Sequence, residues 1–256
     1  MKKFIWPVKV FFIKKITSTN YFAKLHSFSG NKNWTIVWSQ NQTQGKGKGK
    51  NYWYSEKQKN LTFSITFNPI LSFFSKHLYV INYIVSNAIH KFLTKTFNHN
   101  GFYIKWPNDI LINHKKISGI LIENNIFLHK INNVIIGIGL NVHQTKFRKE
   151  WNATSIKKEF NTNCNLYNIL EEIIFAIQKE YFFFIKNGEK KIYQYYIKNL
   201  YMKDQISYFF LCKKNIFVKG IIRFISKKGD LIIEIHNKLY SFFQKEIQYI
   251  NINKIF

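Results

Sequence analysis

The chain has 256 residues, with 39 Lys and Arg against 13 Asp and Glu, which gives a formal net charge of +26 at pH 7. The basic residues are spread along the whole sequence, so they indicate a solvated surface more than a nucleic-acid-binding arm. A field this positive still attracts anionic small molecules and acidic proteins. The length allows one large domain and one small domain.

No apolar run approaches the roughly 20 residues that a membrane-spanning helix requires. The strongest candidate, Ile173–Ile185, is interrupted by polar residues at 178–180. The basic and apolar N-terminus is not followed by a small-residue cleavage site. Cys164 and Cys212 are far apart and belong to no zinc-binding motif. We therefore expect a cytoplasmic protein that does not bind membranes.

The first part of the chain mixes strand and helix patterns. Ser18, Thr19 and Asn20 are good N-cap residues, and Gln40–Asn51 has three glycines and no apolar periodicity, which is typical of a loop. The expected elements are a strand at Phe4–Ile16, a helix at Tyr21–His26, strands at Thr35–Ser39 and Leu61–Phe67, a helix from Leu78 to Phe92, a strand at Tyr103–Trp106, a hairpin of Ile110–Ile112 and Ile117–Ile122, a buried strand at Val134–Val142 and a helix at Leu166–Phe184.

From about Met202 the pattern changes to short strands. We expect them at Ile206–Leu211, Phe217–Phe224, Leu231–Ile235 and Leu239–Phe243, with a turn at 228–230. The sequence therefore predicts an α+β fold with a small β-barrel attached at its C-terminus. The predicted boundary divides the chain into a domain of residues 1–200 and a domain of residues 201–256.

The segment Gln42–Lys50 alternates glycine and lysine. Glycines let a backbone approach a phosphate closely, and lysines neutralise its charge. The segment lacks the Ser or Thr that ends a Walker phosphate loop. Taken alone, it reads more readily as a flexible lysine-rich loop.

Three further segments have the chemistry of a binding site. Lys105–Asp109 (KWPND) ends a strand with a carboxylate, and Asp109 could hold Mg²⁺ together with phosphate oxygens. Lys116–Glu123 (KISGILIE) starts a strand whose glycine permits close approach of a ligand. Gly137 and Gly139 weaken a buried strand unless something flat packs against them. Each segment alone has a structural explanation, as a turn, a strand end or a bulge.

In this order and at these spacings, the segments resemble the catalytic domain of biotin–protein ligases over roughly residues 10–250. The sequences Ala153-Thr154-Ser155 and Phe243-Gln244-Lys245-Glu246-Ile247 are also similar to that family. The resemblance implies a mixed central sheet with flanking helices, as in class II synthetases and biotin–lipoate ligases, and a C-terminal SH3-like β-barrel. It also implies that the chain makes biotinyl-5′-AMP from biotin and ATP with Mg²⁺, and then loads biotin onto a lysine of a biotin carboxyl carrier protein.

The resemblance assigns roles residue by residue. The implied biotin-binding residues are Ser18, Thr19, Asn20, Gln42, Gly45, Lys46, Gly47, Lys48, Lys116, Gly119, Gly137 and Gly139. The implied ATP-binding residues are Lys46, Lys48, Trp53, Lys105, Asn108 and Asn141. The implied catalytic residues are Lys116, Lys48, Lys105 and Asp109, and Asp109 is also the implied Mg²⁺ ligand.

Three departures from the family pattern matter. Lys46 and Lys48 stand where the family has arginines, and lysine cannot make the planar bidentate contact of a guanidinium. Gly49 comes one position early, with Lys50 in the usual place of glycine. We therefore expect weaker retention of biotinyl-AMP. Only 17 residues precede Ser18, too few for the N-terminal DNA-binding domain of some family members, so we expect a short form.

Three alternatives stay open at this point. A lipoate or octanoate ligase shares the fold, but neither its characteristic loop nor an acyl-carrying cysteine is present. A basic nucleic-acid-binding protein accounts for the charge but not for the ordered ligand motifs. A ligase that folds but turns over slowly accounts for the lysines in the loop. The sequence does not decide the oligomeric state, and we expect no nucleic acid partner.

Overall fold

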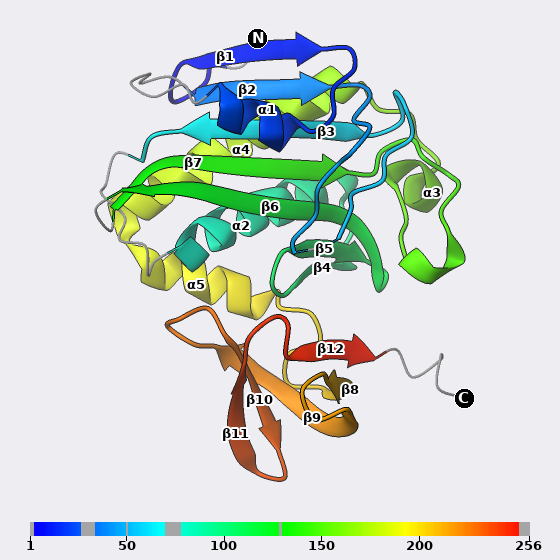
Figure 1. Ribbon diagram of the computed structural model, residues 1–256, viewed down its shortest axis with the longest axis vertical. Helices are drawn as coiled ribbons and strands as arrows, with labels where there is room; N and C mark the ends of the chain where they lie inside the picture. The colour runs from blue at the N-terminus through cyan, green and yellow to red at the C-terminus, as the bar shows by residue number, and fades with distance from the viewer. Residues whose placement is uncertain (1–2, 27–33, 50, 70–77, 128–129, 251–256) are drawn as a thin grey trace.

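The computed structural model describes residues 3–26, 34–49, 51–69, 78–127 and 130–250. It has a seven-stranded sheet, helices on both of its faces, and a second sheet below it (Figure 1). The expected α+β fold with a mixed central sheet is confirmed. The sequence departure at Lys50 lies outside the described residues.

The large sheet has the strand order β1-β2-β3-β7-β6-β5-β4. Only the β1–β2 pair is parallel, and the other neighbours are antiparallel. The strands are β1 (Val8–Ile13), β2 (Trp34–Ser39), β3 (Leu61–Phe67), β4 (Phe102–Lys105), β5 (Asp109–Ile112), β6 (Lys115–Phe127) and β7 (Lys130–Leu140).

The helices divide between the two faces of this sheet. Figure 1 shows α2 (Leu78–Phe97) and α4 (Leu166–Asn187) behind it, α5 (Glu189–Lys198) packed against these two helices, and the short α1 (Thr19–Leu25) in front. The helix α3 (Ile156–Phe160) lies near one end of the sheet. Both faces of the sheet are thus covered at β3, which explains why every residue of this strand is buried although its sequence alternates. The front face, where α1 leaves part of the sheet uncovered, is where the site described below lies.

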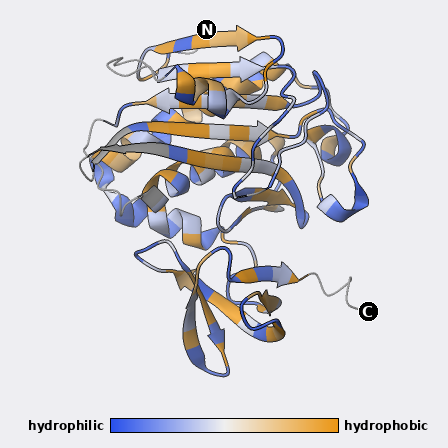
Figure 2. Cartoon of the chain, in the orientation of Figure 1, coloured by the Kyte–Doolittle hydropathy of each residue, from blue (hydrophilic) through white to orange (hydrophobic). Residues whose placement is uncertain are grey.

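Amphipathic patterning holds the back layer in place. The strands of the large sheet are mostly hydrophobic, whereas α2 and α4 carry apolar and polar sides (Figure 2). The expected inner residues of α4 are all buried: Ile169, Leu170, Ile173, Ile174 and Ile177. Among the described residues, no helix combines the length and apolar character that crossing a membrane requires.

The second sheet, which we call the C-terminal sheet, has the strand order β11-β10-β9-β8-β12 and is antiparallel throughout. Its strands are β8 (Ile206–Leu211), β9 (Ile216–Ile225), β10 (Leu231–Ile235), β11 (Lys238–Phe242) and β12 (Ile247–Ile250). The expected turn at 228–230 is present, with Gly229 at φ +88°. Trp106 joins the two sheets, because its Nε1 donates to the Gly229 carbonyl at 3.0 Å.

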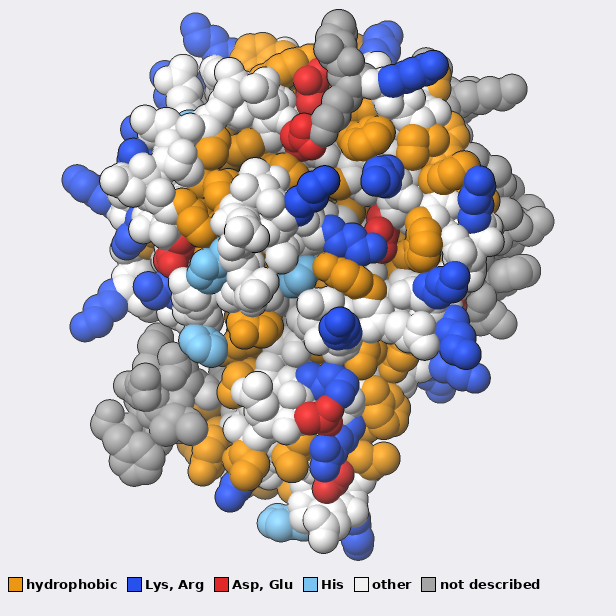
Figure 3. All heavy atoms as spheres, turned by 180° about the vertical axis from the view of Figure 1, so that it is seen from behind, with side chains coloured by type: hydrophobic (Ala, Val, Ile, Leu, Met, Phe, Trp, Pro, Cys, Tyr) orange, Lys and Arg blue, Asp and Glu red, His pale blue; other side chains and the backbone are white. Residues whose placement is uncertain are grey.

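The basic side chains are as dispersed on the surface as they are in the sequence. On the face shown in Figure 3, Lys and Arg side chains are scattered and interleaved with apolar and uncharged ones. The described basic side chains on this face form no continuous track of the kind that a nucleic acid backbone would follow.

Candidate functional site

A cavity of about 1060 Å³ opens on the front of the large sheet and reaches the C-terminal sheet. Every residue expected to bind a ligand lines it, except Gly45 and Asn141. Segments that are far apart in the sequence therefore meet at one place. The lining residues are Ser18, Thr19, Asn20, Gln42, Lys46, Gly47, Lys48, Gly49, Asn51, Tyr52, Trp53, Lys105, Trp106, Pro107, Asn108, Asp109, Lys116, Gly119, Ile120, Leu121, Gly137, Ile138, Gly139, Gln244, Lys245, Ile247, Gln248 and Tyr249.

Neutral polar side chains from the start of α1 form one wall. Ser18 is the N-cap, and its hydroxyl accepts from the Tyr21 backbone N–H. The N–H and hydroxyl of Thr19 both donate to Gln42 Oε1, at 2.9 and 3.1 Å. These bonds fix the Gln42 amide beside α1, and the N-cap fixes α1 itself.

A second layer of contacts orients Asn20. Its amide donates to Glu123 Oε2 at 2.8 Å, and its Oδ1 accepts from the Ser64 hydroxyl at 2.6 Å. Ser64 is also 2.8 Å from the hydroxyl of Thr19. Sequence reasoning missed Ser64, because nothing in an alternating strand marks one serine as a site residue.

Glycines in the sheet make room for these groups. Ser64 pairs with Gly137 across β3 and β7, and a Cβ on Gly137 would lie 2.3 Å from Asn20 Oδ1. Gly119 and Gly139 pair directly across β6 and β7, and we call these two the glycine patch. Because side chains of paired residues point to the same face, the patch is a flat bare surface facing the cavity.

Trp53 covers the glycine patch. A Cβ on Gly139 would lie 2.2 Å from an indole carbon of Trp53, and one on Gly119 would lie 2.9 Å from another. Of the two glycines for which the sequence suggested a flat partner, Gly139 has one in this side chain, whereas Gly137 packs against Asn20. The indole Nε1 is buried and has no hydrogen-bond partner among the described residues.

Residues 45–49, which we call the glycine loop, lie against residues 51–53 and place that indole. The Trp53 N–H donates to the Gly45 carbonyl at 2.8 Å, and the Gly47 N–H donates to the Asn51 carbonyl at 2.8 Å. A Cβ on Gly45 would collide with the Trp53 carbonyl and the Gln42 amide. Gly45 therefore lies beneath the site rather than in its lining, and it permits the approach of these two neighbours.

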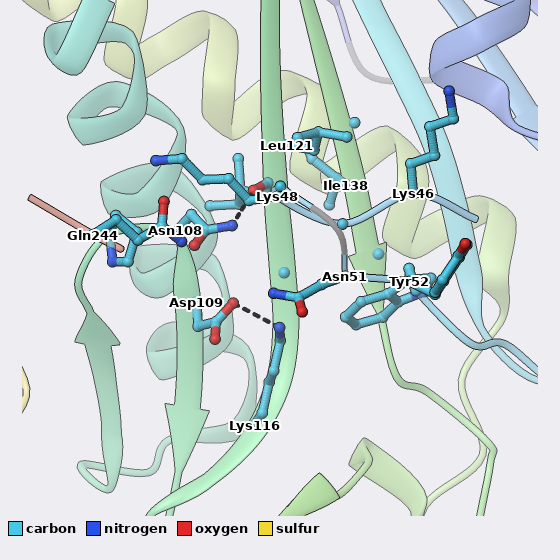
Figure 4. Close-up of a pocket in the computed structure, with 18 of the residues that line it drawn as sticks. Lys46, Lys48, Asn51, Tyr52, Asn108, Asp109, Lys116, Leu121, Ile138 and Gln244 are labelled. Carbon is cyan, nitrogen blue, oxygen red and sulfur yellow. Dashed lines mark hydrogen bonds and ion pairs between the residues drawn. The ribbon is translucent and has the colours of Figure 1, made fainter. Parts of the chain in front are cut away.

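Cations surround one carboxylate on the other side of the cavity. Figure 4 shows Asp109 and Lys116 pointing toward each other from β5 and β6, and their Nζ–Oδ1 distance is 2.7 Å. The Lys116 ammonium also lies 5.4 Å from the centre of the Trp53 ring. Lys46 points away from this pair, with its ammonium over the ring of Tyr21.

Desolvation changes the titration of two lysines here. Burial lowers the pKa of Lys105, while Asp109 acts to raise it and Lys116 to lower it further. Burial also lowers the pKa of Lys48, although much of that side chain is exposed, and Asp109 opposes the shift. Both groups face an anion-attracting cavity with less solvation than a surface lysine has.

Asn108 and Asn141 have structural partners. Asn108 Nδ2 donates to the Ile120 carbonyl at 2.6 Å, which ties the KWPND turn to β6. Asn141 is buried, and its amide donates to the Thr154 carbonyl at 2.9 Å. Thr154 in turn donates its N–H to the Lys116 carbonyl. The structure therefore places Asn141 behind the strand that carries Lys116, outside the cavity lining.

Asp109 is the one carboxylate among the described lining residues. In the described part of the chain, no group of three or more His, Cys, Asp and Glu side chains is arranged to hold a metal ion. A single carboxylate fits a cation such as Mg²⁺, which takes one or two carboxylates together with phosphate oxygens. It does not fit a zinc or calcium site built from protein ligands alone.

Sequence reasoning assigned no role to the residues that the C-terminal sheet contributes. Gln244, Lys245, Ile247, Gln248 and Tyr249 all line the cavity. The resemblance of residues 243–247 to a known family was the available signal. It did not indicate that this segment reaches the same cavity as KWPND.

Comparisons with known proteins agree with this geometry. Two curated relatives, the bifunctional ligase/repressor BirA of Bacillus subtilis and that of Bacillus spizizenii, are each 38% identical over 89 residues. That alignment covers 33% of this chain and 27% of each relative. Biotin–protein ligase 2 of Arabidopsis thaliana is 32% identical over 127 residues, which cover 47% of this chain and 37% of the relative. The matches thus span about a third of the relatives' length.

Solved structures share the fold over nearly the full length. The biotin protein ligase from Aquifex aeolicus, in complex with biotin and ATP, has a TM-score of 0.76 at 21% identity, covering 94% of this chain and 98% of that one. The Leishmania major enzyme, in complex with biotinyl-5-AMP, has a TM-score of 0.64 at 19% identity, covering 91% and 98%.

The family model described as the biotin/lipoate A/B protein ligase family matches residues 12–141, just over half of the 256 residues. This match includes α1, the glycine loop, KWPND, the Lys116 strand and the glycine patch. The chain belongs to the biotin/lipoate A/B protein ligase family.

Proposed function

We propose that the chain is an ATP-dependent biotin–protein ligase, which forms biotinyl-5′-AMP and then transfers biotin to a specific lysine of a biotin carboxyl carrier protein. One observation carries the proposal. A single cavity joins neutral donors and acceptors around Thr19 and Asn20 to three lysines around Asp109. A ureido ring requires donors and acceptors, whereas a carboxylate and a triphosphate require cations.

In the proposed first step, a carboxylate oxygen of biotin attacks the α-phosphorus of ATP and pyrophosphate leaves. Both reactants are anions, so cations must screen their repulsion, and positioning supplies much of the remaining acceleration. We assign this role to Lys116, Lys105 and Lys48. Lys116 is the central group, because its ammonium is held between the Asp109 carboxylate and the Trp53 ring.

Asp109 is the residue that would hold Mg²⁺, in agreement with its place as the one carboxylate in the described lining. When bound, the ion would neutralise charge on the phosphate oxygens. The lysines supply the positive charge that the chain itself contributes to this part of the cavity.

In the proposed second step, the neutral amine of the carrier lysine attacks the acyl carbon, the bond to phosphate breaks and AMP leaves. This step needs no nucleophile from the ligase. The mixed anhydride is easily hydrolysed, so water must be excluded. The glycine loop suits this role, because it already folds over the front of the sheet through its contacts with Trp53.

The proposed function extends to the organisation, location and acceptor of the ligase. Residues 1–200 would form the catalytic domain, and residues 201–256 an SH3-like β-barrel that includes the C-terminal sheet. The ligase would act in the cytoplasm. The acceptor would be the carrier domain of acetyl-CoA carboxylase or a related carboxylase, whose acidic surface the positive charge of the chain would attract.

The test is to incubate the protein with biotin, Mg-ATP and a biotin carboxyl carrier domain, and to weigh the acceptor by mass spectrometry. We expect a mass increase of one biotinyl group that requires both ATP and the acceptor lysine. A parallel reaction with lipoate separates the two branches of the family. Lipoylation without biotinylation, or no modification of either kind, would contradict the proposal.

A further inference from the structure

The C-terminal sheet does more than close one side of the cavity. Its strand β12 and the turn before it supply five lining residues, and Tyr249 is one of them. The ring of Tyr249 packs at 5.5 Å from Phe209 and 6.3 Å from Tyr201, measured between ring centres. Its hydroxyl is buried, and burial raises the pKa of Tyr249, so the ring stays a neutral phenol. The ring is therefore an uncharged aromatic surface that packs against two neighbouring rings.

Lys105 extends from the end of β4 onto this ring. Its ammonium lies 4.8 Å from the centre of the Tyr249 ring, within the range of a cation–π contact. No hydrogen bond or ion pair to the Lys105 ammonium is seen among the described residues. Asp109, the nearby carboxylate, has its close ion pair with Lys116 instead. Among the described residues, the Tyr249 ring is thus the side-chain contact seen for the Lys105 ammonium, while Asp109 and Lys116 act on it without a direct ion pair or hydrogen bond.

The residue after Lys105 is held by the same sheet. Trp106 Nε1 donates to the Gly229 carbonyl in the β9–β10 turn at 3.0 Å. That turn is itself closely packed, because a Cβ on Gly229 would lie 3.0 Å from Tyr79. Two consecutive residues of KWPND are therefore fixed by two separate parts of the C-terminal sheet.

We propose that Tyr249 is a positioning residue for Lys105, and that the C-terminal sheet through it completes the anion-binding part of the cavity. A desolvated ammonium on a flexible four-carbon stem needs such a contact, because otherwise it would turn toward solvent. The inference rests on the proposed function only for the identity of the anion, a nucleoside triphosphate. The geometry itself requires only an anion with the chemistry of a polyphosphate.

The test compares Tyr249→Phe and Tyr249→Leu with the wild-type protein, using Tyr240→Leu as the matched control. Tyr240 lies on β11 of the same sheet, is 45% exposed and does not line the cavity. Binding of inorganic pyrophosphate is measured by calorimetry, and KM values are measured separately for ATP and biotin. We expect Tyr249→Leu to weaken pyrophosphate binding and raise the KM for ATP by about threefold to thirtyfold. Tyr249→Phe and Tyr240→Leu should stay within about twofold, and the KM for biotin should not change.

Two further experiments test the same contact if Tyr249→Leu does not fold. Fluorinated phenylalanines at position 249 keep the ring shape but withdraw its π density, so each added fluorine should weaken pyrophosphate binding further. In a Lys105→Met background, the Tyr249 changes should have no additional effect. Equal losses with and without the Lys105 ammonium, or no response to fluorination, would overturn the inference.

These measurements distinguish a failure of the proposed ligase function from a failure of the proposed role of Tyr249. Pyrophosphate binding needs neither biotin nor a carrier. A wild-type protein that binds pyrophosphate but never adenylates biotin would contradict the proposed function and leave the role of Tyr249 standing. A wild-type protein that does not bind pyrophosphate would overturn the anion site.

Discussion

Asn20 and Glu123 are joined by a hydrogen bond of 2.8 Å between an amide and a carboxylate oxygen, although 103 residues separate them in sequence. Asn20 is almost fully buried. Its amide can donate and accept in two orientations that differ by a half-turn, and only one of them places the N–H groups toward Glu123. Glu123, together with the Ser64 hydroxyl that donates to Asn20 Oδ1, therefore selects the face that Asn20 presents to a ligand.

Replacing Glu123 by Leu should weaken biotin binding about tenfold, because the Asn20 amide loses its shorter acceptor, at 2.8 Å, and keeps only the Leu121 carbonyl at 3.4 Å. Glu123→Gln keeps an acceptor oxygen and should stay within about threefold of wild type. Calorimetric titration with biotin measures both. ATP binding serves as the control, since it should be the same in the two variants. Equal biotin affinity in Glu123→Leu and wild type would show that Asn20 is oriented by other contacts.

This pair illustrates what the sequence could not predict. The segment KISGILIE marked Lys116 and Gly119, but the partner of Glu123 depends on the packing of α1 against the sheet. Ser64 is a similar case, because its role follows from its register opposite Gly137. Contacts between segments that are distant in the sequence cannot be predicted from local patterns, because they depend on the tertiary structure.

Helices with long amphipathic patterns and strands with strongly apolar or alternating patterns were predictable from the sequence. The strands Leu61–Phe67, Ile206–Leu211 and Leu231–Ile235 occur with the expected bounds. The first strand is shorter than expected, at Val8–Ile13. The helices α3 and α5 and the strand β12 were missed. Only Ile192 and Tyr196 of α5 are buried, so its apolar stripe is too narrow for the sequence pattern to predict a helix. The four-residue β12 is fixed mainly by its pairing with β8.

A methyl group on Gly139 should displace the Trp53 indole, because its Cβ would lie 2.2 Å from a ring carbon. We expect Gly139→Ala to lower the free energy of unfolding by about 1–3 kcal/mol. In a Trp53→Ala background the same change should cost much less, since the clash is gone. Gly137→Ala is the matched control, because its Cβ meets Asn20 and should not be rescued by Trp53→Ala. Denaturant unfolding of the four Gly139 and Trp53 combinations measures the coupling, and equal costs in both backgrounds would contradict the packing.

Lys116→Ala should reduce pyrophosphate release from biotin and ATP by at least about 100-fold while biotin still binds. The ammonium lost is the one paired with Asp109 at 2.7 Å, so the variant leaves that carboxylate near two incoming anions. Pyrophosphate release and biotin calorimetry separate the two effects. Lys115→Ala is a suitable control, because Lys115 is the preceding residue and is not among the cavity-lining residues. Unchanged adenylation in Lys116→Ala would remove Lys116 from the catalytic role.

As the pH rises, the affinity for ATP should begin to fall at a lower pH than it would if Lys105 had the pKa of an ordinary lysine. Burial lowers the pKa of Lys105 below its usual 10.5. A lowered pKa means that the ammonium loses its proton, and with it the attraction for phosphate, at a pH where a solvated lysine is still charged. The KM for ATP should therefore rise at a pH below the ordinary lysine pKa of 10.5. Lys105→Arg should remove that rise, because a guanidinium keeps its charge. A rise of equal size in Lys105→Arg would assign the titration to another group, with Lys48 the next to test.

Lys48→Arg should slow the release of biotinyl-AMP by about threefold to tenfold, because a guanidinium makes bidentate contacts to phosphate that an ammonium cannot. Lys46→Arg should have a smaller effect, although both positions belong to the same loop. The Lys46 ammonium lies over the ring of Tyr21, away from Asp109 and Lys116, whereas Lys48 is close enough to Asp109 for that carboxylate to act on its pKa. Chasing labelled biotinyl-AMP with unlabelled biotin and ATP gives the release rates. Equal rates for Lys48→Arg and wild type would show that lysine in this loop does not weaken adenylate retention, and a larger effect at position 46 would reverse the assignment of the two lysines.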